Sequence, residues 1–203
     1  MLDKLKAGLQ SLGVDAEPQA CDHYLAYIAL LDKWNKTYNL TAVKDPVQML
    51  ERHVLDSLSV LSYIEGQHCI DIGTGPGLPG MILAIAQADV EWSLLDSNHK
   101  KTSFLNHVKA ELGLSNVEVV HSRSESYKPE KRFDTVICRA FAPLDRILEQ
   151  CQHLITDDNQ LLAMKGKQAQ EEINELADNE FSIQLHDLAY SSDANLIQIR
   201  RAE

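Results

Sequence analysis

Residues 68–80 of this 203-residue chain read HCIDIGTGPGLPG. The first five of these residues form a short, mostly apolar run, which is typical of a buried strand. Glycines follow at positions 73, 75, 77 and 80, and Met81 to Ala86 then read as a helix, with Pro79 suited to its first turn. Glycines between a strand and a helix allow positive φ angles and a close approach of the backbone to a ligand. The stretch therefore predicts a strand, a binding loop and a helix, with the loop at the carboxyl end of the strand.

Strands and helices alternate along the chain after this loop. An acid-rich run over 171–180 reads as a helix with a solvated face. The last two strands have only a Ser-Ser-Asp turn region between them, so we expect them to pair antiparallel at the end of the sheet. The alternation predicts βαβ units and a mostly parallel sheet of Rossmann-like α/β class. The expected strands are 68–72, 91–96, 117–120, 133–138, 161–164, 181–185 and 196–199.

The first sixty residues have a different pattern. Apolar residues recur at helical spacing over 2–12 and 24–34, and Asp45-Pro46 is a typical cap and first turn for a third helix. We therefore expect an N-terminal helical cap over residues 1–60 and an α/β domain over residues 61–203.

Composition restricts the class of protein. With 19 Lys+Arg against 30 Asp+Glu, the formal net charge is −11, which argues against a non-specific polyanion binder. Residues 141–203 carry 12 acidic and 5 basic residues, whereas basic residues recur near several expected strand ends. The chain shows no apolar run of bilayer length and no signal peptide, and its four cysteines are scattered. These features predict a cytoplasmic protein without a membrane span, a disulfide scaffold or a metal site.

The spacing of the loop glycines indicates the ligand. The third glycine of a G-x-G-x-x-G dinucleotide fingerprint would fall at Leu78, and no Gly-Lys-Ser/Thr follows as in a P-loop. Asp96 ends the second strand and is placed to bind the hydroxyls of a ribose. A nucleobase edge could lie near Arg123, Ser124 and Glu125. An adenosine without pyrophosphate, bound through Gly73 and Gly75, indicates S-adenosylmethionine.

The motifs resemble those of a known family. Residues 71–80 (DIGTGPGLPG), 33–41 (KWNKTYNLT) and 52–57 (RHVLDS), with Arg139-Ala140-Phe141-Ala142, are similar to the bacterial small-subunit ribosomal RNA methyltransferase G family, also called glucose-inhibited division protein B. The resemblance implies an S-adenosylmethionine-dependent methyltransferase that modifies N7 of one guanine, guanine 527, in 16S ribosomal RNA of the small subunit. It also implies cofactor contacts at Gly73, Leu78, Ser124, Glu125 and Arg139.

The chemistry at guanine N7 makes modest demands. N7 has an in-plane lone pair and no proton to lose, so transfer needs no strong general base, and we assign no catalytic residue. Holding N7 in line with the sulfonium methyl can supply most of the rate enhancement. The guanidinium of Arg139 supports this role if it holds the cofactor carboxylate or an RNA phosphate. Cys138 is interpreted as a buried strand residue and not as a nucleophile.

Residues that could meet RNA lie near the same expected edge of the sheet. Solvated charge is the alternative for the basic members of this set, and simple packing is the alternative for the histidine. The candidates are Asn39, Arg52, His53, Lys100, Arg123 and Lys165. Two other functions stay open at this point: a non-enzymatic module that binds S-adenosylmethionine or another adenosine nucleoside, and a methyltransferase of proteins or small molecules. We expect a monomer.

Overall fold

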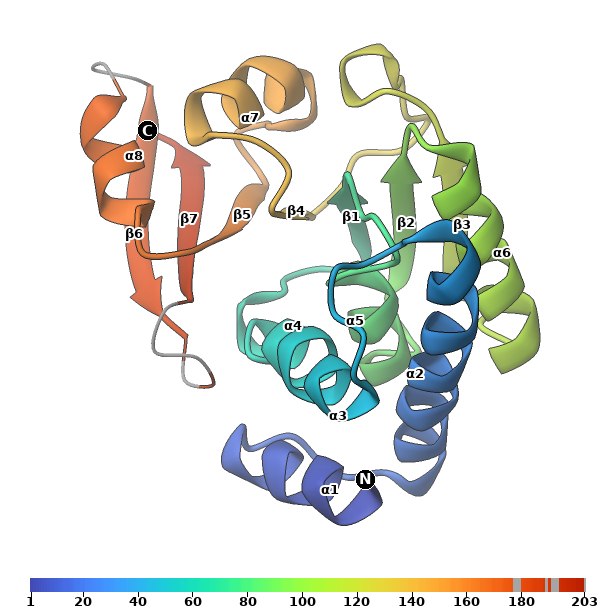
Figure 1. Cartoon of the computed structure of the whole chain (residues 1–203). Coiled ribbons are helices and arrows are strands. Elements are labelled where there is room, and N and C mark those ends of the chain that lie inside the picture. The colour runs from blue at the N-terminus through green and yellow to red at the C-terminus, as the bar shows by residue number, and fades with distance from the viewer. Residues whose placement is uncertain (177–179, 189, 191–193, 203) are drawn as a thin grey trace.

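A seven-stranded sheet forms the centre of the protein in the computed structural model, which describes residues 1–176, 180–188, 190 and 194–202. The strand order is β3-β2-β1-β4-β5-β7-β6, and Figure 1 shows the sheet running from the orange-red C-terminal strands to β3, beside α6. The first five strands are mutually parallel, and β7 is antiparallel to both β5 and β6. The strands are β1 (His68–Ile72), β2 (Glu91–Asp96), β3 (Val117–His121), β4 (Thr135–Arg139), β5 (Gln160–Lys165), β6 (Phe181–Asp187) and β7 (Asn195–Arg201).

Helices cover both faces of the sheet. One face packs against α5, α6 and the N-terminal helices in one hydrophobic cluster, and the other packs against α7 and α8 in a second cluster. The helices are α1 (Leu2–Ser11), α2 (Pro18–Tyr38), α3 (Pro46–Met49), α4 (Asp56–Leu58), α5 (Gly80–Ala86), α6 (His99–Leu112), α7 (Leu144–Cys151) and α8 (Ala169–Glu175). A π-helical turn, Leu50–Leu55, joins α3 to α4. Short 3₁₀ turns occupy Leu61–Tyr63, Ser124–Ser126 and Gln152–Leu154.

The predicted α/β class, the parallel strands and the antiparallel end are confirmed. Alternation of helices and strands fixed the strand positions to within two residues, because each strand is a short apolar run between turn residues. Cys138 is 1% exposed, as expected for a strand residue. The predicted turn at 191–193 and residues 177–179 of the acid-rich run lie outside the described residues.

The acid-rich helix has the expected solvated face, with Gln170, Glu171, Asn174 and Glu175 exposed, but Glu172 departs from it. The helix ends at Glu175, and one of its carboxylates is partly enclosed. Glu172 accepts hydrogen bonds from the Lys165 ammonium, 2.7 Å away, and from the backbone N–H of Leu144, also at 2.7 Å. A helix-face pattern could not reveal this, because the partners come from β5 and from the start of α7.

The N-terminal helices pack directly on the α/β part. Asp45 caps α3 as predicted, its carboxylate accepting from the backbone N–H of Gln48 at 2.8 Å. Tyr27 on α2 donates its hydroxyl to the carbonyl of Pro76 in the glycine loop, 2.9 Å away. In Figure 1, α2 runs beside α6, and the rings of Trp34 and Phe104 lie 5.6 Å apart. The division of the chain at residue 60 stays a prediction.

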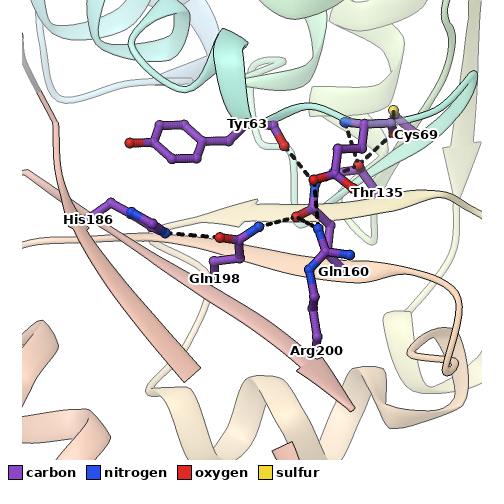
Figure 2. A network of polar contacts seen from close by, with 8 residues as sticks. Tyr63, Cys69, Thr135, Gln160, His186, Gln198 and Arg200 are labelled. Atoms are coloured by element: carbon purple, nitrogen blue, oxygen red, sulfur yellow. Dashed lines mark hydrogen bonds and ion pairs between the residues drawn. The ribbon is translucent and has the colours of Figure 1, made fainter. Parts of the chain in front are cut away.

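A polar network holds the C-terminal strands to the start of the sheet (Figure 2). Gln160, the first residue of β5, is fully buried, and its amide donates to the carbonyl of Tyr63 at 2.6 Å and to the hydroxyl of Thr135 at 3.2 Å. Its amide oxygen accepts from Gln198 at 2.6 Å and from Arg200 at 3.1 Å. One side chain therefore connects β4, β5, β7 and the turn before β1.

Replacing this amide tests the network. We expect Gln160→Leu to lower the free energy of unfolding by about 1–3 kcal/mol, because it leaves buried donors and acceptors without partners. Urea denaturation measures the change. Gln170→Leu, on the exposed surface of α8, is the matched control and should stay within about 0.5 kcal/mol of the wild type. Equal effects of the two substitutions would contradict a stabilising network.

Candidate functional site

The glycine loop between β1 and α5 contains three left-handed residues. Gly73, Gly75 and Gly77 have φ angles of 64°, 63° and 99°, which disfavour residues with a side chain. A Cβ at Gly73 would also overlap the ring of Phe141. The sequence therefore needs glycine at position 73 for two reasons: the direction of the backbone and the proximity of an aromatic ring that follows β4.

Asp71 lies beneath this loop with its side chain fully buried. One carboxylate oxygen accepts from the hydroxyl of Thr74 at 2.6 Å and from the backbone N–H of Gly80 at 2.8 Å. The other oxygen has no hydrogen-bond partner among the described residues. Burial raises the pKa of Asp71 to about 7, although these hydrogen bonds and the charge of Arg139 act in the opposite direction.

Asp96, at the end of β2, holds the loop from the other side. Its two carboxylate oxygens accept from the backbone N–H of Gly75 at 2.9 Å and from that of Asn98 at 2.8 Å. The Lys101 ammonium lies 3.5 Å away, and the Asp96 side chain is only 7% exposed. The carboxylate therefore fixes the loop and also faces the hollow described next.

A hollow of about 290 Å³ opens at the carboxyl ends of β1, β2 and β4. Five predicted residues line it together: Gly73, Asp96, Arg123, Ser124 and Glu125. The Ser124 hydroxyl donates to the Glu125 carboxylate at 3.0 Å.

Three other predicted cofactor residues, Leu78, Gly75 and Arg139, lie outside the lining of this hollow. The side chain of Leu78 is 5% exposed and packs in the hydrophobic cluster on the α5 side of the sheet. Gly75 does not line the hollow, but its backbone N–H donates to Asp96, which does.

A second hollow, of about 430 Å³, lies beside the first. Ala140 and Phe141 line both, so these two residues form the wall between them. Ala140 has a φ angle of 48°, an uncommon conformation for a residue with a side chain. Arg139 lines the second hollow and not the first. A third hollow of about 490 Å³ adjoins the second, sharing Asp56, Lys165, Gly166 and Ala194 with it.

Arg139 connects the end of β4 to the N-terminal helices. Nη1 of its guanidinium donates to the Asp56 carboxylate at 2.8 Å and to the carbonyl of Arg52 at 3.1 Å. Nη2 lies 3.3 Å from Nδ1 of His53. The side chains of Arg139 and Asp56 are 19% and 18% exposed, so their ion pair is largely shielded from water.

His53 is 5% exposed, and its Nε2 lies 2.9 Å from the hydroxyl of Thr41. Burial, together with the positive charge of Arg139, lowers the pKa of His53 to about 4. The imidazole is therefore neutral at pH 7. The π-helical turn accounts for this grouping, because it carries Arg52 and His53 and leads into Asp56.

The remaining RNA candidates are placed differently from one another. Asn39 is exposed at the end of α2 with a φ angle of 49°, and Lys100 is exposed in the first turn of α6. The Arg123 side chain is 75% exposed, 3.8 Å from Glu125. Lys165 is bound within the protein: its side chain is 9% exposed and its ammonium donates to Glu172 and, at 2.6 Å, to the carbonyl of Ala142.

The recurrence of basic residues near strand ends suggested that they gather at one edge of the sheet. The structure shows that some of them lie elsewhere. Lys131 lies 3.2 Å from Glu91, which begins β2, and Arg132 precedes β4 and lies 3.7 Å from Asp158. Both are at the amino ends of the strands, opposite the glycine loop.

Several residues of the two hollows were not predicted. Asp56 and Phe141 stand inside the motifs at 52–57 and 139–142, so a sequence signal for them existed. Lys101 and Gln150 line the first hollow from α6 and α7, and nothing in the local sequence distinguishes them from other polar helix residues.

In the described part of the chain, no helix is long and apolar enough to cross a membrane. Over the same residues, no group of three or more His, Cys, Asp or Glu side chains could hold a metal ion.

Comparison with known sequences identifies the family. A family model described as "rRNA small subunit methyltransferase G" matches residues 20–198. The chain belongs to this family. The ribosomal RNA small subunit methyltransferase G of Hydrogenovibrio crunogenus is 46% identical, over 98% of this chain and 94% of that protein. The protein of the same name from Salmonella arizonae is 47% identical, over 91% of this chain and 88% of that protein.

Comparison with solved structures agrees on the fold. A ribosomal protein L11 methylase from Lactobacillus delbrueckii subsp. bulgaricus superimposes with a TM-score of 0.59 at 16% identity, over 75% of this chain and 79% of that chain. A SAM-dependent methyltransferase from Aquifex aeolicus gives a TM-score of 0.59 at 18% identity, over 79% of this chain and 96% of that chain. The fold is that of the S-adenosylmethionine-dependent methyltransferases.

The contacts of Asp96 predict that its substitution weakens cofactor binding. We expect Asp96→Asn to weaken binding of S-adenosylmethionine by about tenfold or more, because the amide has only one acceptor for the two backbone N–H groups of Gly75 and Asn98. Isothermal titration calorimetry measures the affinity. Asp89→Asn, at an exposed position before β2, is the control and should bind as the wild type does. An unchanged affinity in Asp96→Asn would contradict the role of Asp96.

The buried carboxyl of Asp71 predicts a pH dependence of stability. Its pKa in the folded protein, about 7, lies above the usual value of 3.8, so the folded state keeps a proton that the unfolded chain releases. The resulting stabilisation is present below pH 4 and is lost as the pH rises to 7, with a slope of up to about 1.4 kcal/mol per pH unit.

Asp71→Asn has no such proton, and its Oδ1 can still accept from Thr74 and Gly80. We therefore expect the wild type to lose stability relative to this variant between pH 4 and 7. Urea unfolding at a series of pH values measures the difference. A constant difference, or one of opposite sign, would contradict the raised pKa.

Proposed function

We propose that this protein transfers the methyl group of S-adenosylmethionine to N7 of one guanine, guanine 527, in 16S ribosomal RNA. Family membership supports an S-adenosylmethionine-dependent enzyme that acts on small-subunit ribosomal RNA. The observation that carries the proposal is the pair of adjacent hollows on either side of Ala140 and Phe141. One is suited to the methyl donor and the other to the base that accepts the methyl group.

The chemistry of the first hollow fits the cofactor. Gly73 lines the hollow, and the carboxylates of Asp96 and Glu125 line it as hydrogen-bond acceptors. Two carboxylates also complement the positive charges of a sulfonium and an ammonium group. When bound, the cofactor supplies an electrophilic methyl group. The protein's part is to hold Gly73, Asp96, Ser124 and Glu125 in fixed positions around it.

The second hollow fits a base that has been taken out of its stack. Its lining combines apolar groups at Phe141, Pro143 and Met164 with the charged side chains of Arg139 and Asp56. A base removed from RNA needs such a mixture of flat apolar surface and polar groups at its edges. Because N7 has no proton to lose, the protein needs only to orient the base toward the first hollow, a step that proximity can accelerate greatly.

The contacts of Arg139 favour a role in binding RNA over a role in binding the cofactor carboxylate. Three of its five N–H groups engage Asp56, Arg52 and His53, and the other two, on Nε and Nη2, have no partner among the described residues. In the second hollow those two groups can donate to a phosphate or to a base oxygen. Exposed Arg123, Lys100 and Asn39 extend the proposed contact surface. Lys165 contributes by fixing the loop at Ala142.

Methyl incorporation tests the function directly. The protein is incubated with labelled S-adenosylmethionine and, in separate arms, with 16S ribosomal RNA and assembled small subunits, and modified guanines are mapped by cleavage at N7-methylguanine. Label at one guanine in either arm supports the proposal. No label in either arm overturns it and favours a binding module or a different methyl acceptor. Action as a monomer in the cytoplasm stays a prediction, tested by the mass of the protein in solution and by its location in cells.

A substitution at Arg139 tests its assignment. We expect Arg139→Ala to retain the fold and the affinity for S-adenosylmethionine but to lose about a hundredfold in methyl transfer, because the base loses its orienting group. Arg146→Ala, on the exposed side of α7, is the control and should transfer at the wild-type rate. Unchanged transfer in Arg139→Ala would exclude the role. Lost cofactor affinity would instead assign Arg139 to the carboxylate of the cofactor.

A further inference from the structure

The guanidinium of Arg139 meets three acceptors of different kinds that come from one segment. They are the peptide oxygen of Arg52, the carboxylate of Asp56 and the imidazole nitrogen Nδ1 of His53. The first two suffice to balance the charge and to fill one side of the guanidinium. The third acceptor fixes a second nitrogen of the guanidinium and so further restricts its rotation.

The hydrogen bonds of His53 determine which of its nitrogens carries the proton. A guanidinium can only donate, so the contact with Arg139 is a hydrogen bond when Nδ1 is the unprotonated acceptor. The proton is then on Nε2, which donates to the hydroxyl oxygen of Thr41, 2.9 Å away. The same oxygen accepts from the backbone N–H of Val43 at 3.2 Å.

The chain of contacts continues to a second loop. Asn35 accepts the backbone N–H of Thr41 at 2.9 Å and donates to the carbonyl of Val43 at 3.2 Å. This loop follows directly from Asn39, the exposed left-handed residue at the end of α2. His53 therefore stands between the loop and Arg139, with one ring nitrogen for each.

We propose that His53 is a positioning residue: its neutral ring, protonated at Nε2, orients Arg139 in the second hollow and couples that orientation to the loop at residues 39–43. It makes no contact with the reacting atoms. This inference rests on the proposed function, in which Arg139 binds the RNA side of the transfer. It assigns His53 to a different role from direct contact with RNA, which its 5% exposure does not favour.

Two substitutions separate the two nitrogens. In His53→Asn the amide oxygen can occupy the place of Nδ1 and accept from Arg139, but nothing reaches Thr41. In His53→Gln the amide reaches the place of Nε2 and can bond with Thr41, but the acceptor for Arg139 is gone. Each variant is the matched control for the other, because both remove the ring and leave a neutral amide.

The expected result is asymmetric. His53→Asn should keep kcat on small subunits within about threefold of the wild type, whereas His53→Gln should lose about tenfold or more, the size of one hydrogen bond to a charged group. The KM for S-adenosylmethionine should be unchanged in both, because the lining of the first hollow does not include His53. Equal losses in the two variants, or losses that follow the fall in melting temperature, would overturn the proposal.

Thr41 supplies a second test by coupling. Thr41→Val should reduce kcat in the wild-type background by no more than about threefold, the limit also expected for His53→Asn, and have no further effect in His53→Asn, where the bond to Thr41 is already absent. Thr41→Ser, which keeps the hydroxyl, should restore the wild-type rate. Additive effects of Thr41→Val and His53→Asn would contradict the coupling.

A spectroscopic measurement is independent of activity. Nitrogen-15 NMR of the histidine rings should show His53 protonated at Nε2 and unprotonated at Nδ1 throughout pH 6–8. A proton on Nδ1 would overturn the inference even in an active enzyme. If the wild type shows no transfer to any ribosomal substrate, the proposed function fails, and the ring measurement still decides the arrangement around Arg139.

Discussion

The conformation of the glycine loop is the constraint on which the rest of the site depends. Three left-handed glycines in five residues would be a flexible segment in isolation, because glycine loses more conformational entropy on ordering than other residues. Two carboxylates compensate. Asp71 holds the loop at Thr74 and Gly80, and Asp96 holds it at Gly75. Burying Asp71 has an electrostatic cost, visible in its raised pKa, and part of that cost is offset by the hydrogen bonds that order the loop.

The site also requires that the sheet and the N-terminal helices keep a fixed position relative to each other. The sheet supplies the ends of β1, β2 and β4, whereas the loop at 39–43 and the π-helical turn belong to the N-terminal helices. Arg139 bridges these parts with an ion pair and two further hydrogen bonds, and Tyr27 bridges them at the glycine loop. Removing either member of the Arg139–Asp56 pair would leave a charge in a largely enclosed place, a more severe change than the loss of a surface pair.

Most of the fold and about half of the site residues could be predicted from the sequence. Strand positions, the antiparallel end and the grouping of Gly73, Asp96, Ser124 and Glu125 follow from local patterns, because carboxyl ends of parallel strands meet at one edge. The partners of Arg139, Lys165 and Glu172 could not be found in this way. They depend on which side chains meet across helices that are far apart in the sequence. The family resemblance implies a cofactor contact at Leu78, whose side chain packs in the core.

The acidity of the chain can now be related to the site. Both cations that line the second hollow are paired with carboxylates: Arg139 with Asp56, and Lys165 with Glu172. Cations that are paired inside the protein attract a polyanion less than free ones do, and contribute little to counterion release. What remains for RNA is a small number of N–H groups in fixed directions, together with a few exposed basic side chains such as Arg123. Such a surface discriminates by geometry more than by charge, and a net charge of −11 is then compatible with an enzyme that modifies one base in a large RNA.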